Sequence, residues 1–256
     1  MTFAPHAPID SHPMFGSEDI KSTRLLKMPK HIAIIMDGNR RWAMQKGLPF
    51  IMGHREGAEV LTNIVRAAQS FGIQTITVYS FSTENWFRSE QEVQGVLELF
   101  QIYLIGQMEQ MVRDGIRLET IGDLTRFPES LQNTFAFVKK NTVDCRKINL
   151  VLALNYGARD EIRRAVVKIL EKNQQQRMPP EELTEELISR HLDTSRWGDP
   201  ELMIRTGGEL RLSNFLLWQI SYAEIYVTEK LWPDFSSNDL LEALVSFQKR
   251  KRRWGR

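Results

Sequence analysis

The sequence lacks several features that would restrict its compartment or its partners. Its single cysteine, Cys145, excludes an internal disulfide and permits a reducing cytosol. No apolar run approaches the roughly 18 residues that a membrane span requires. A net charge of +2 gives no broad basic field, so the composition does not favour nucleic acid as a partner. We therefore expect a cytoplasmic protein that binds no nucleic acid.

Common chemical motifs are missing as well. The chain has no GxxxxGK[ST] P-loop, no GxGxxG after a strand, no GxSxG, no HExxH and no paired-cysteine zinc spacing. These absences weigh against a P-loop nucleotide site, a dinucleotide fold, a serine-hydrolase elbow and a zinc site.

The length and composition are those of a globular protein. The chain has 256 residues, of which 42% are hydrophobic and 26% charged, so it can bury a substantial core. Its first 28 residues are polar, contain Pro5, Pro8 and Pro13, and lack the apolar segment of a signal peptide. We expect residues 1–28 to be a flexible leader and residues 29–256 to form one domain.

Strand patterns alternate with helix patterns along the whole domain. Strands are predicted at about 31–35, 75–80, 116–121, 149–154, 202–205 and 224–228. Helices are predicted at about 53–71, 90–114, 128–140, 159–175, 181–192 and 214–220, and from 236 onward. This order predicts an α/β fold with a mainly parallel sheet of about six strands and helices on both faces. The apolar stripe of helix 90–114 indicates core packing or one wall of an apolar cavity.

The first strand is followed by a dense polar cluster. Ile32–Ile35 run without alternation, as in a strand buried on both faces, and Asp37, Asn39, Arg40 and Arg41 follow. A carboxylate beside two arginines suits a metal-bound polyphosphate. The alternative is an Asp-Gly turn with a solvated basic helix behind it.

Polar clusters also follow the second and fifth strands. The carboxyl ends of parallel strands share one edge, so these clusters can meet there. The expected cations are Arg40, Arg41, His54, Arg88, Arg205 and Arg211, and the expected acids are Asp37, Glu84, Glu209 and Glu224. Two pyrophosphates and a divalent metal would engage most of these charges, whereas a salt-bridged turn is the alternative for the later arginines. Four aromatic residues could cover a carbocation there or belong to the core: Trp42, Phe81, Trp86 and Phe87.

Together these residues resemble the cis-prenyltransferase family, with its bacterial undecaprenyl pyrophosphate synthases. The matching motifs occur in the family's order and cover about residues 30–254. They are residues 31–43, 53–54, 79–86, 155–157, 204–209, 211–219, 222–224 and 231–235. The Asp-Asp-x-x-Asp motif of the trans-prenyl synthases is absent.

The resemblance implies an activity and a set of partners. The family adds isopentenyl pyrophosphate to an allylic pyrophosphate such as farnesyl pyrophosphate, with cis double bonds and Mg²⁺. A long polyprenyl pyrophosphate is implied, with undecaprenyl pyrophosphate as a carrier for cell-wall synthesis, together with a hydrophobic tunnel and a homodimer. A non-catalytic partner subunit of the same fold is the alternative, although such partners typically lack the motif residues Asp37 and Asn85. A generic phosphohydrolase is a third reading.

The same resemblance implies individual roles. Asp37 and Glu224 would hold Mg²⁺, and Asn85 is the family's proposed proton acceptor. Because a neutral amide is a poor base, we expect water or the released pyrophosphate to take part in proton transfer. Substrate contacts are implied for Gly38, Asn39, Arg40, Arg41, Trp42, His54, Ser82, Thr83, Glu84, Trp86, Arg88, Arg205, Arg211, Leu212 and Ser213.

Two departures and a basic end complete the sequence predictions. Phe50 stands where many relatives have an arginine four residues before the histidine, so we expect one pyrophosphate contact to be lost. Leu210 stands where well-known bacterial members have histidine, with little expected effect. Residues 249–253 with Trp254 could place the protein peripherally at the inner membrane face for product release, or complement a helix end. As an Arg-x-Gly tail, Arg253–Gly255 could instead reach a partner's active site.

Overall fold

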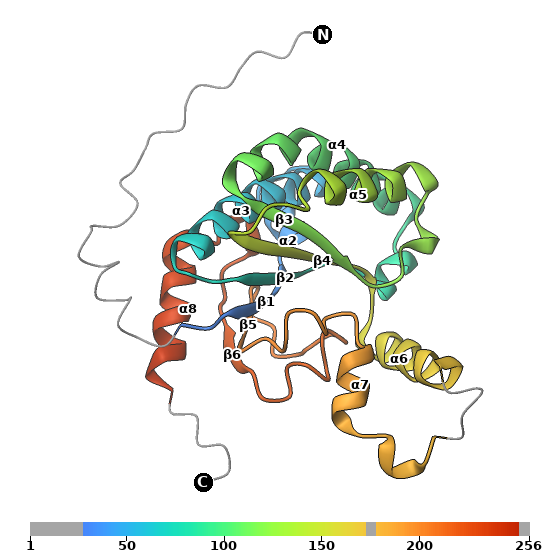
Figure 1. Ribbon diagram of the computed structural model, residues 1–256. Helices are drawn as coiled ribbons and strands as arrows, with labels where there is room; N and C mark the ends of the chain where they lie inside the picture. The colour runs from blue at the N-terminus through green and yellow to red at the C-terminus, as the bar shows by residue number, and fades with distance from the viewer. Residues whose placement is uncertain (1–27, 173–177, 251–256) are drawn as a thin grey trace.

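A six-stranded parallel sheet forms the centre of the computed structural model, which describes residues 28–172 and 178–250 (Figure 1). The strand order is β3-β4-β2-β1-β5-β6, and every neighbouring pair is parallel. The strands are β1 His31–Ile35, β2 Thr75–Ser82, β3 Ile116–Ile121, β4 Ile148–Tyr156, β5 Leu202–Arg205 and β6 Glu224–Val227. The predicted α/β class and parallel sheet are therefore confirmed.

The helices divide unequally between the two faces of the sheet. Side chains of α3, α4, α5 and α8 share one core cluster with one face, whereas α6 and the turns at 212–220 pack on the other (Figure 1). The helices are α2 Asn39–Gln45, α3 Phe50–Ser70, α4 Glu90–Asp114, α5 Glu129–Asn141, α6 Ala158–Lys172, α7 Glu185–His191 and α8 Ser237–Lys249. Short 3₁₀ turns lie at η1 Thr83–Phe87, η2 Leu124–Arg126, η3 Pro180–Glu182 and η4 Trp232–Asp234.

The strand β1 explains why the first apolar run does not alternate. All five of its residues are buried. Ile32 and Ile34 face the thicker helical layer, and Ala33 and Ile35 face the opposite core. A strand covered on both sides needs apolar residues at every position, which is the pattern in the sequence.

Some predicted elements differ from the structure. The expected helix at 214–220 is a series of turns, because Ser213, Asn214 and Leu216 have φ angles of 49°, 62° and 46°. Left-handed residues cannot continue a right-handed helix. The predicted helix at 181–192 is divided into η3 and α7. The predicted leader, apart from Met28, and the basic end beyond Arg250 lie outside the described residues.

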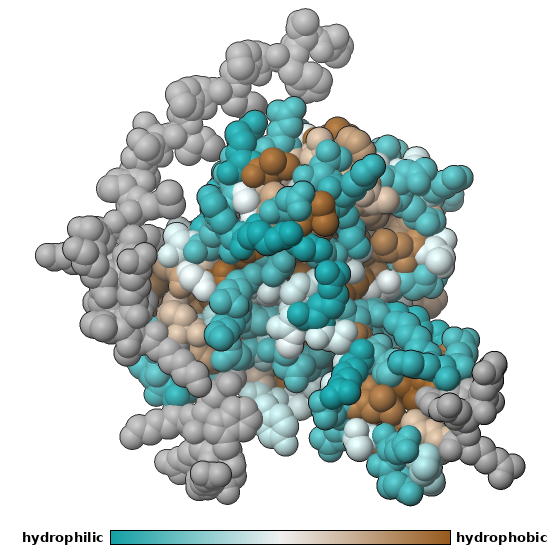
Figure 2. Space-filling view, in the orientation of Figure 1, coloured by the Kyte–Doolittle hydropathy of each residue, from teal (hydrophilic) through white to brown (hydrophobic). Residues whose placement is uncertain are grey.

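The visible surface is mostly hydrophilic, with separate hydrophobic patches among charged side chains (Figure 2). Ile102 and Ile105 of α4 are exposed apolar residues. Within residues 28–172 and 178–250, no helix combines the length and apolar character needed to cross a bilayer.

Candidate active site

The ends of β1 and β5 bring an acid and two arginines together. Arg205 Nη2 donates to Asp37 Oδ2 at 2.8 Å, and Arg41 Nη2 donates to Asp37 Oδ1 at 3.2 Å. Arg41 also donates to the Gly207 carbonyl at 2.9 Å. Both carboxylate oxygens of Asp37 are thus held by cations, so the carboxylate is kept in a fixed orientation.

Arg205 is the buried cation of this cluster. Its side chain is only 3% exposed. Its Nη1 donates to Ser213 Oγ at 3.0 Å and to the Arg211 carbonyl, whereas its buried Nε has no hydrogen-bond partner. A buried guanidinium with an unused donor is costly unless an acceptor reaches it, so this position is suited to an anion.

Asp37, Arg205 and Ser213 line an open cleft of about 580 Å³, which we call the polar cleft. Residues at the ends of β1, β2 and β5 and in the turn after Leu212 form its walls. They are Ile35, Met36, Asp37, Tyr79, Ser82, Glu84, Asn85, Arg88, Arg205, Arg211, Ser213 and Asn214. The three predicted polar clusters therefore converge at one edge of the sheet.

Asn85 is fixed by the turn that carries it. Its Oδ1 accepts a hydrogen bond from the Ser82 backbone N–H at 3.0 Å, at the start of η1. Glu84 in the same turn accepts from Asn214 Nδ2 at 3.2 Å and from Thr83 Oγ1 at 3.0 Å. Because the Asn85 oxygen is already engaged, its NH₂ group is the part that can donate to a ligand.

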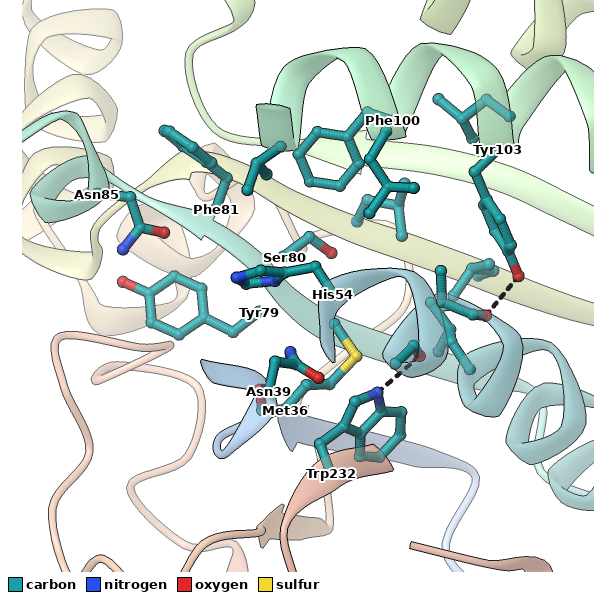
Figure 3. Close-up of a pocket in the computed structure, with 18 of the residues that line it drawn as sticks. Met36, Asn39, His54, Tyr79, Ser80, Phe81, Asn85, Phe100, Tyr103 and Trp232 are labelled. Carbon is teal, nitrogen blue, oxygen red and sulfur yellow. Dashed lines mark hydrogen bonds between the residues drawn. The ribbon is translucent and has the colours of Figure 1, made fainter. Parts of the chain in front are cut away.

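A second space, the apolar cavity, lies between α3, α4 and the sheet. Its volume is about 160 Å³, and aliphatic and aromatic side chains line most of it. Figure 3 shows Asn85, Tyr79 and His54 toward one end and Phe100 and Tyr103 toward the other. The polar cleft and the apolar cavity share four lining residues, which we call the rim: Met36, Tyr79, Asn85 and Arg88.

Two polar side chains that line the apolar cavity each have one buried atom without a hydrogen-bond partner. His54 Nε2 and Asn39 Oδ1 are buried and make no hydrogen bond. Burial, with a second contribution from the positive charge of Arg88, lowers the pKa of His54 to about 4. His54 is therefore neutral near pH 7 and gains a favourable interaction only when an acceptor or an anion approaches.

Two glycines of α3, Gly53 and Gly57, allow α2 to pack closely against α3. A Cβ atom on Gly53 would collide with the Asn39 carbonyl, and one on Gly57 would collide with the Asn39 side chain and approach Trp232 within 2.8 Å. Small residues one turn apart thus allow α2 to lie directly against α3. This close approach places Asn39 and His54 in the same cavity.

Several residues implied by the resemblance lie around these spaces without lining them. Trp42 is buried and donates to Asp234 Oδ1 at 2.7 Å. Trp86 donates to Asn155 Oδ1 at 2.8 Å, and Arg40 forms an ion pair with Glu92 at 3.6 Å. The others are Gly38, Arg41, Thr83 and Leu212, and within the described part of the chain none of these seven lines either space. Their substrate contacts stay predictions.

Glu224 requires a correction. It begins β6 in register with Leu202, whereas Arg205 ends β5 in register with Val227. Three residues of strand separate the two ends, roughly 10 Å. Its carboxylate pairs with Arg250 at 2.8 Å. The expectation that Glu224 lies at the same edge as Asp37 of its own chain is therefore wrong, since a residue that starts a parallel strand lies at the opposite edge.

The donors available for a metal are few. Among the described residues, no group of three or more His, Cys, Asp or Glu side chains could hold an ion. Asp37 offers one carboxylate beside the polar cleft. Mg²⁺ commonly uses one or two carboxylates and completes its shell with water and substrate phosphates, so this donor set fits a metal that binds together with a pyrophosphate.

The sequence did not single out several lining residues. Met36 and Tyr79 belong to the rim, and Asn214 lines the polar cleft beside Ser213. All three lie in segments that carry the family resemblance, which was the available signal. Phe100, Tyr103 and Trp232 line the apolar cavity. The apolar stripe of helix 90–114 included Phe100 but not Tyr103, and Trp232 lies in the matching segment 231–235.

Comparisons with known sequences agree on one family. The family model Prenyltransf, which describes undecaprenyl diphosphate synthase, matches residues 35–255. An isoprenyl transferase of Oceanobacillus iheyensis is 43% identical over 244 residues, which cover 94% of this chain and 97% of that protein. An isoprenyl transferase of Chlamydia trachomatis is 46% identical over 234 residues, covering 90% and 92%.

Solved structures show the same fold. Lavandulyl diphosphate synthase from Lavandula x intermedia, in complex with dimethylallyl diphosphate, matches with a TM-score of 0.86 and 35% identity, covering 90% of this chain and 99% of that chain. A probable undecaprenyl diphosphate synthase from Campylobacter jejuni matches with a TM-score of 0.76 and 33% identity, covering 90% and 100%.

Proposed function

The chain belongs to the undecaprenyl diphosphate synthase family, whose curated relatives are isoprenyl transferases, and from this premise we propose that it extends an allylic pyrophosphate with isopentenyl pyrophosphate in the cis configuration. One observation carries the proposal. The polar cleft, rich in arginine, meets the apolar cavity at a shared rim. A prenyl pyrophosphate has the same two parts, a charged head and an oily tail.

The residues divide the chemistry between them. Arg205, Arg211 and Ser213 are placed to bind one pyrophosphate head in the cleft. Asn39 and His54 offer unpaired atoms in the lining of the apolar cavity. Negative charge grows on the leaving pyrophosphate as its carbon–oxygen bond breaks, and fixed cations stabilise that charge. When bound through Asp37, Mg²⁺ would neutralise further charge on the same group.

Asn85 acts in this scheme by donation. Because its oxygen accepts from the Ser82 N–H, its NH₂ group can orient a water molecule or a pyrophosphate oxygen at the rim. The oxygen of this water or pyrophosphate, rather than the Asn85 amide, takes the proton lost when the new double bond forms.

Farnesyl pyrophosphate as primer and undecaprenyl pyrophosphate as product are part of the proposal. The resemblance implies both, and chromatography of the dephosphorylated products against polyprenol standards would test the length. The likeness to a lavandulyl diphosphate synthase shows that this fold serves more than one prenyl product.

The function is tested with purified protein, labelled isopentenyl pyrophosphate, farnesyl pyrophosphate and Mg²⁺. Labelled butanol-soluble product supports the proposal. Binding without product indicates a non-catalytic partner subunit, and phosphate release alone indicates a phosphohydrolase. Asp37→Asn should abolish turnover with the fold retained, whereas Asp160→Asn, which breaks two ion pairs on α6, should remain active.

Transient membrane contact is proposed for product release. Each isoprene unit adds about five carbons, and burying them in the protein is worth roughly 3–4 kcal/mol at about 0.8 kcal/mol per CH₂ group. A long tail therefore leaves the protein slowly, and a membrane that accepts the tail would accelerate its release. Phe87 and Met44 are 90% and 67% exposed. Glu92 forms ion pairs with Arg88 and Arg40. Arg88 is next to Phe87 in the chain, and Arg40 is one turn before Met44. The two exposed apolar side chains therefore lie on either side of one cluster of ion pairs. Phe87→Ser should reduce sedimentation with phosphatidylglycerol vesicles.

A homodimer is proposed through β6. In the described part of the chain this strand is one of the two edges of the sheet, β3 being the other, and its Ile225 is 41% exposed. An edge strand presents backbone groups that a second copy can cover. Light scattering should give the mass of two chains, and Ile225→Lys should shift it toward one. A wild-type mass of one chain would exclude the homodimer.

A further inference from the structure

The turn after Leu212 supplies the cap for the first turn of α6. Gly157 precedes this helix and has no side chain that could accept the free N–H groups at its start. Asn214 accepts two of these groups instead. The Ala158 N–H donates to its backbone carbonyl at 2.8 Å, and the Arg159 N–H donates to its side-chain Oδ1 at 3.0 Å. A residue from a distant part of the chain therefore completes the start of the helix.

The side chain of Asn214 also reaches η1. Its Nδ2 donates to Glu84 Oε1 at 3.2 Å, so one amide group joins α6 through its oxygen and η1 through its nitrogen. A Cβ atom on Gly157 would lie 2.7 Å from this nitrogen and 2.9 Å from Thr83 Oγ1. Three segments thus meet at Gly157, and the absence of a side chain there leaves room for the bridge between them.

The residue next to Asn214 is held by other contacts. The Tyr79 hydroxyl lies 3.2 Å from the Ser213 carbonyl and 3.1 Å from the Tyr156 carbonyl, and Arg205 donates to Ser213 Oγ at 3.0 Å. These contacts do not involve the Asn214 side chain. Ser213 would therefore keep its place beside Arg205 if that side chain were removed.

The turn η1 has less support. None of its five residues is buried. In the described part of the chain, its side chains form hydrogen bonds with two other segments, from Trp86 to Asn155 and from Asn214 to Glu84. Although burial raises the pKa of Glu84, hydrogen bonds from its own backbone and from Asn214 hold it below its usual range, so the acceptor is charged near pH 7. Asn85 lies between these two attachments.

We propose that Asn214 is a positioning residue: its side chain ties η1 to α6 and thereby holds Asn85 beside the turn that carries Ser213. This inference rests on the proposed function, because it concerns the proton transfer in which Asn85 takes part. The role requires no contact between Asn214 and a substrate. Loss of the tie should slow turnover, whereas a pyrophosphate should still bind to Arg205 and Ser213.

Two substitutions separate the two hydrogen bonds of the side chain. Asn214→Asp keeps an oxygen for the Arg159 N–H and adds a favourable charge at the start of a helix, but it loses the donor and faces the Glu84 carboxylate. Asn214→Gly loses both bonds, and glycine adopts the φ of 62° at this position without strain. A double variant, Asn214→Asp with Glu84→Gln, restores the bond because the new amide can donate to the new carboxylate.

Turnover and binding are compared in the first test, with labelled isopentenyl pyrophosphate and farnesyl pyrophosphate. Asn214→Asp should lower kcat about tenfold, the loss expected for one hydrogen bond to a charged group, and should change the Kd of inorganic pyrophosphate by less than about twofold. In the Glu84→Gln background the same substitution should not lower kcat. The matched control is Ser189→Ala, which removes a bond between α7 and Trp218 of the same segment and should leave kcat unchanged.

Hydrogen–deuterium exchange of the free protein is the second test and requires no turnover. Asn214→Asp should speed exchange several-fold in η1 and leave the start of α6 as in wild type. Asn214→Gly should speed exchange in both segments, since both bonds are lost. The double variant should return η1 to the wild-type rate. If Asn214→Gly fails to fold, Asn214→Asp still tests the tie, because it retains the cap of α6.

The outcomes separate this inference from the function on which it rests. A wild-type enzyme that forms no prenyl product refutes the proposed function, and the exchange test then decides the tie alone. Equal exchange of η1 in wild type and Asn214→Asp refutes the tie. An unchanged kcat in Asn214→Asp, or the same loss in the Glu84→Gln background, refutes the positioning role. An equal loss of turnover and of pyrophosphate affinity would assign Asn214 to the pyrophosphate-binding turn and also refute it.

Discussion

Binding of a pyrophosphate should be accompanied by proton uptake at His54. In the free protein the pKa of this imidazole is lowered to about 4, first by burial and then by the charge of Arg88. Its Nε2 is buried and has no partner. An anion that reaches this atom favours the protonated form, so the pKa of His54 should rise when the site is filled.

The size of the rise follows from the geometry of contact. An anionic oxygen about 4 Å from the ring, at an effective dielectric constant of about 20, contributes about 4 kcal/mol for each unit of charge. One pKa unit corresponds to about 1.4 kcal/mol, so the shift is about 3 units. The pKa of His54 should move from about 4 to about 7, and close to one proton should be taken up at pH 6.

Calorimetry with inorganic pyrophosphate at pH 6, in two buffers of different ionisation enthalpy, measures this uptake. His54→Gln should lose it, whereas His191→Gln on α7, away from the lining of either space, should keep it. The ionisation of pyrophosphate itself is the same in all three proteins, so the difference belongs to the histidine. Equal proton uptake in wild type and His54→Gln would refute the reasoning.

Three further predictions concern His31, Asn155 and Phe50. His31 donates from Nδ1 to the Gly198 carbonyl, and burial lowers the pKa of His31 to about 4. As the pH falls below about 6.5, the unfolded chain therefore binds a proton at this histidine before the folded chain does. At pH 5 the free energy of unfolding should for this reason be about 2 kcal/mol smaller than at pH 7. Urea unfolding of His31→Gln should show a correspondingly weaker loss between pH 7 and pH 5, and an identical loss would contradict the assignment. Asn155→Ala removes the acceptor for the Trp86 indole and a donor to a backbone carbonyl, so the free energy of unfolding measured in urea should be about 2–4 kcal/mol smaller, and an unchanged value would contradict this role. Phe50→Arg restores a cation beside His54 and should tighten binding of farnesyl pyrophosphate; unchanged affinity in a fluorescence titration would show that the arginine is not needed there.

Much of the fold could be predicted because the apolar runs of the buried strands indicate that both of their faces are covered. β1 and β4 read as continuous apolar runs, and helices of regular period separate them, so a parallel sheet was the natural interpretation. The turns after Leu212 could not be predicted in this way. Ser213, Asn214 and Leu216 adopt left-handed conformations, which tertiary packing imposes and no residue pattern announces.

In the candidate site, too, some residues could be placed from the sequence and others could not. Asp37, Arg205 and Arg211 could be assigned to one edge, since each lies at or just after the carboxyl end of a strand. Glu224 was misplaced although its position at the start of a strand already indicated the opposite edge. The place of Tyr103 in the lining of the apolar cavity required coordinates, because the apolar stripe of residues 90–114 does not include it.

The bond between Asp37 and Arg205 joins residues that lie 168 positions apart in the chain. A nascent polypeptide that has not yet delivered β5 to the sheet therefore has no complete anion site, however well its first half has formed. Any molecule that binds there recognises only the finished domain and, by mass action, draws the folding equilibrium toward it. In a cell rich in prenyl pyrophosphates, the substrate would thus also protect the enzyme against unfolding.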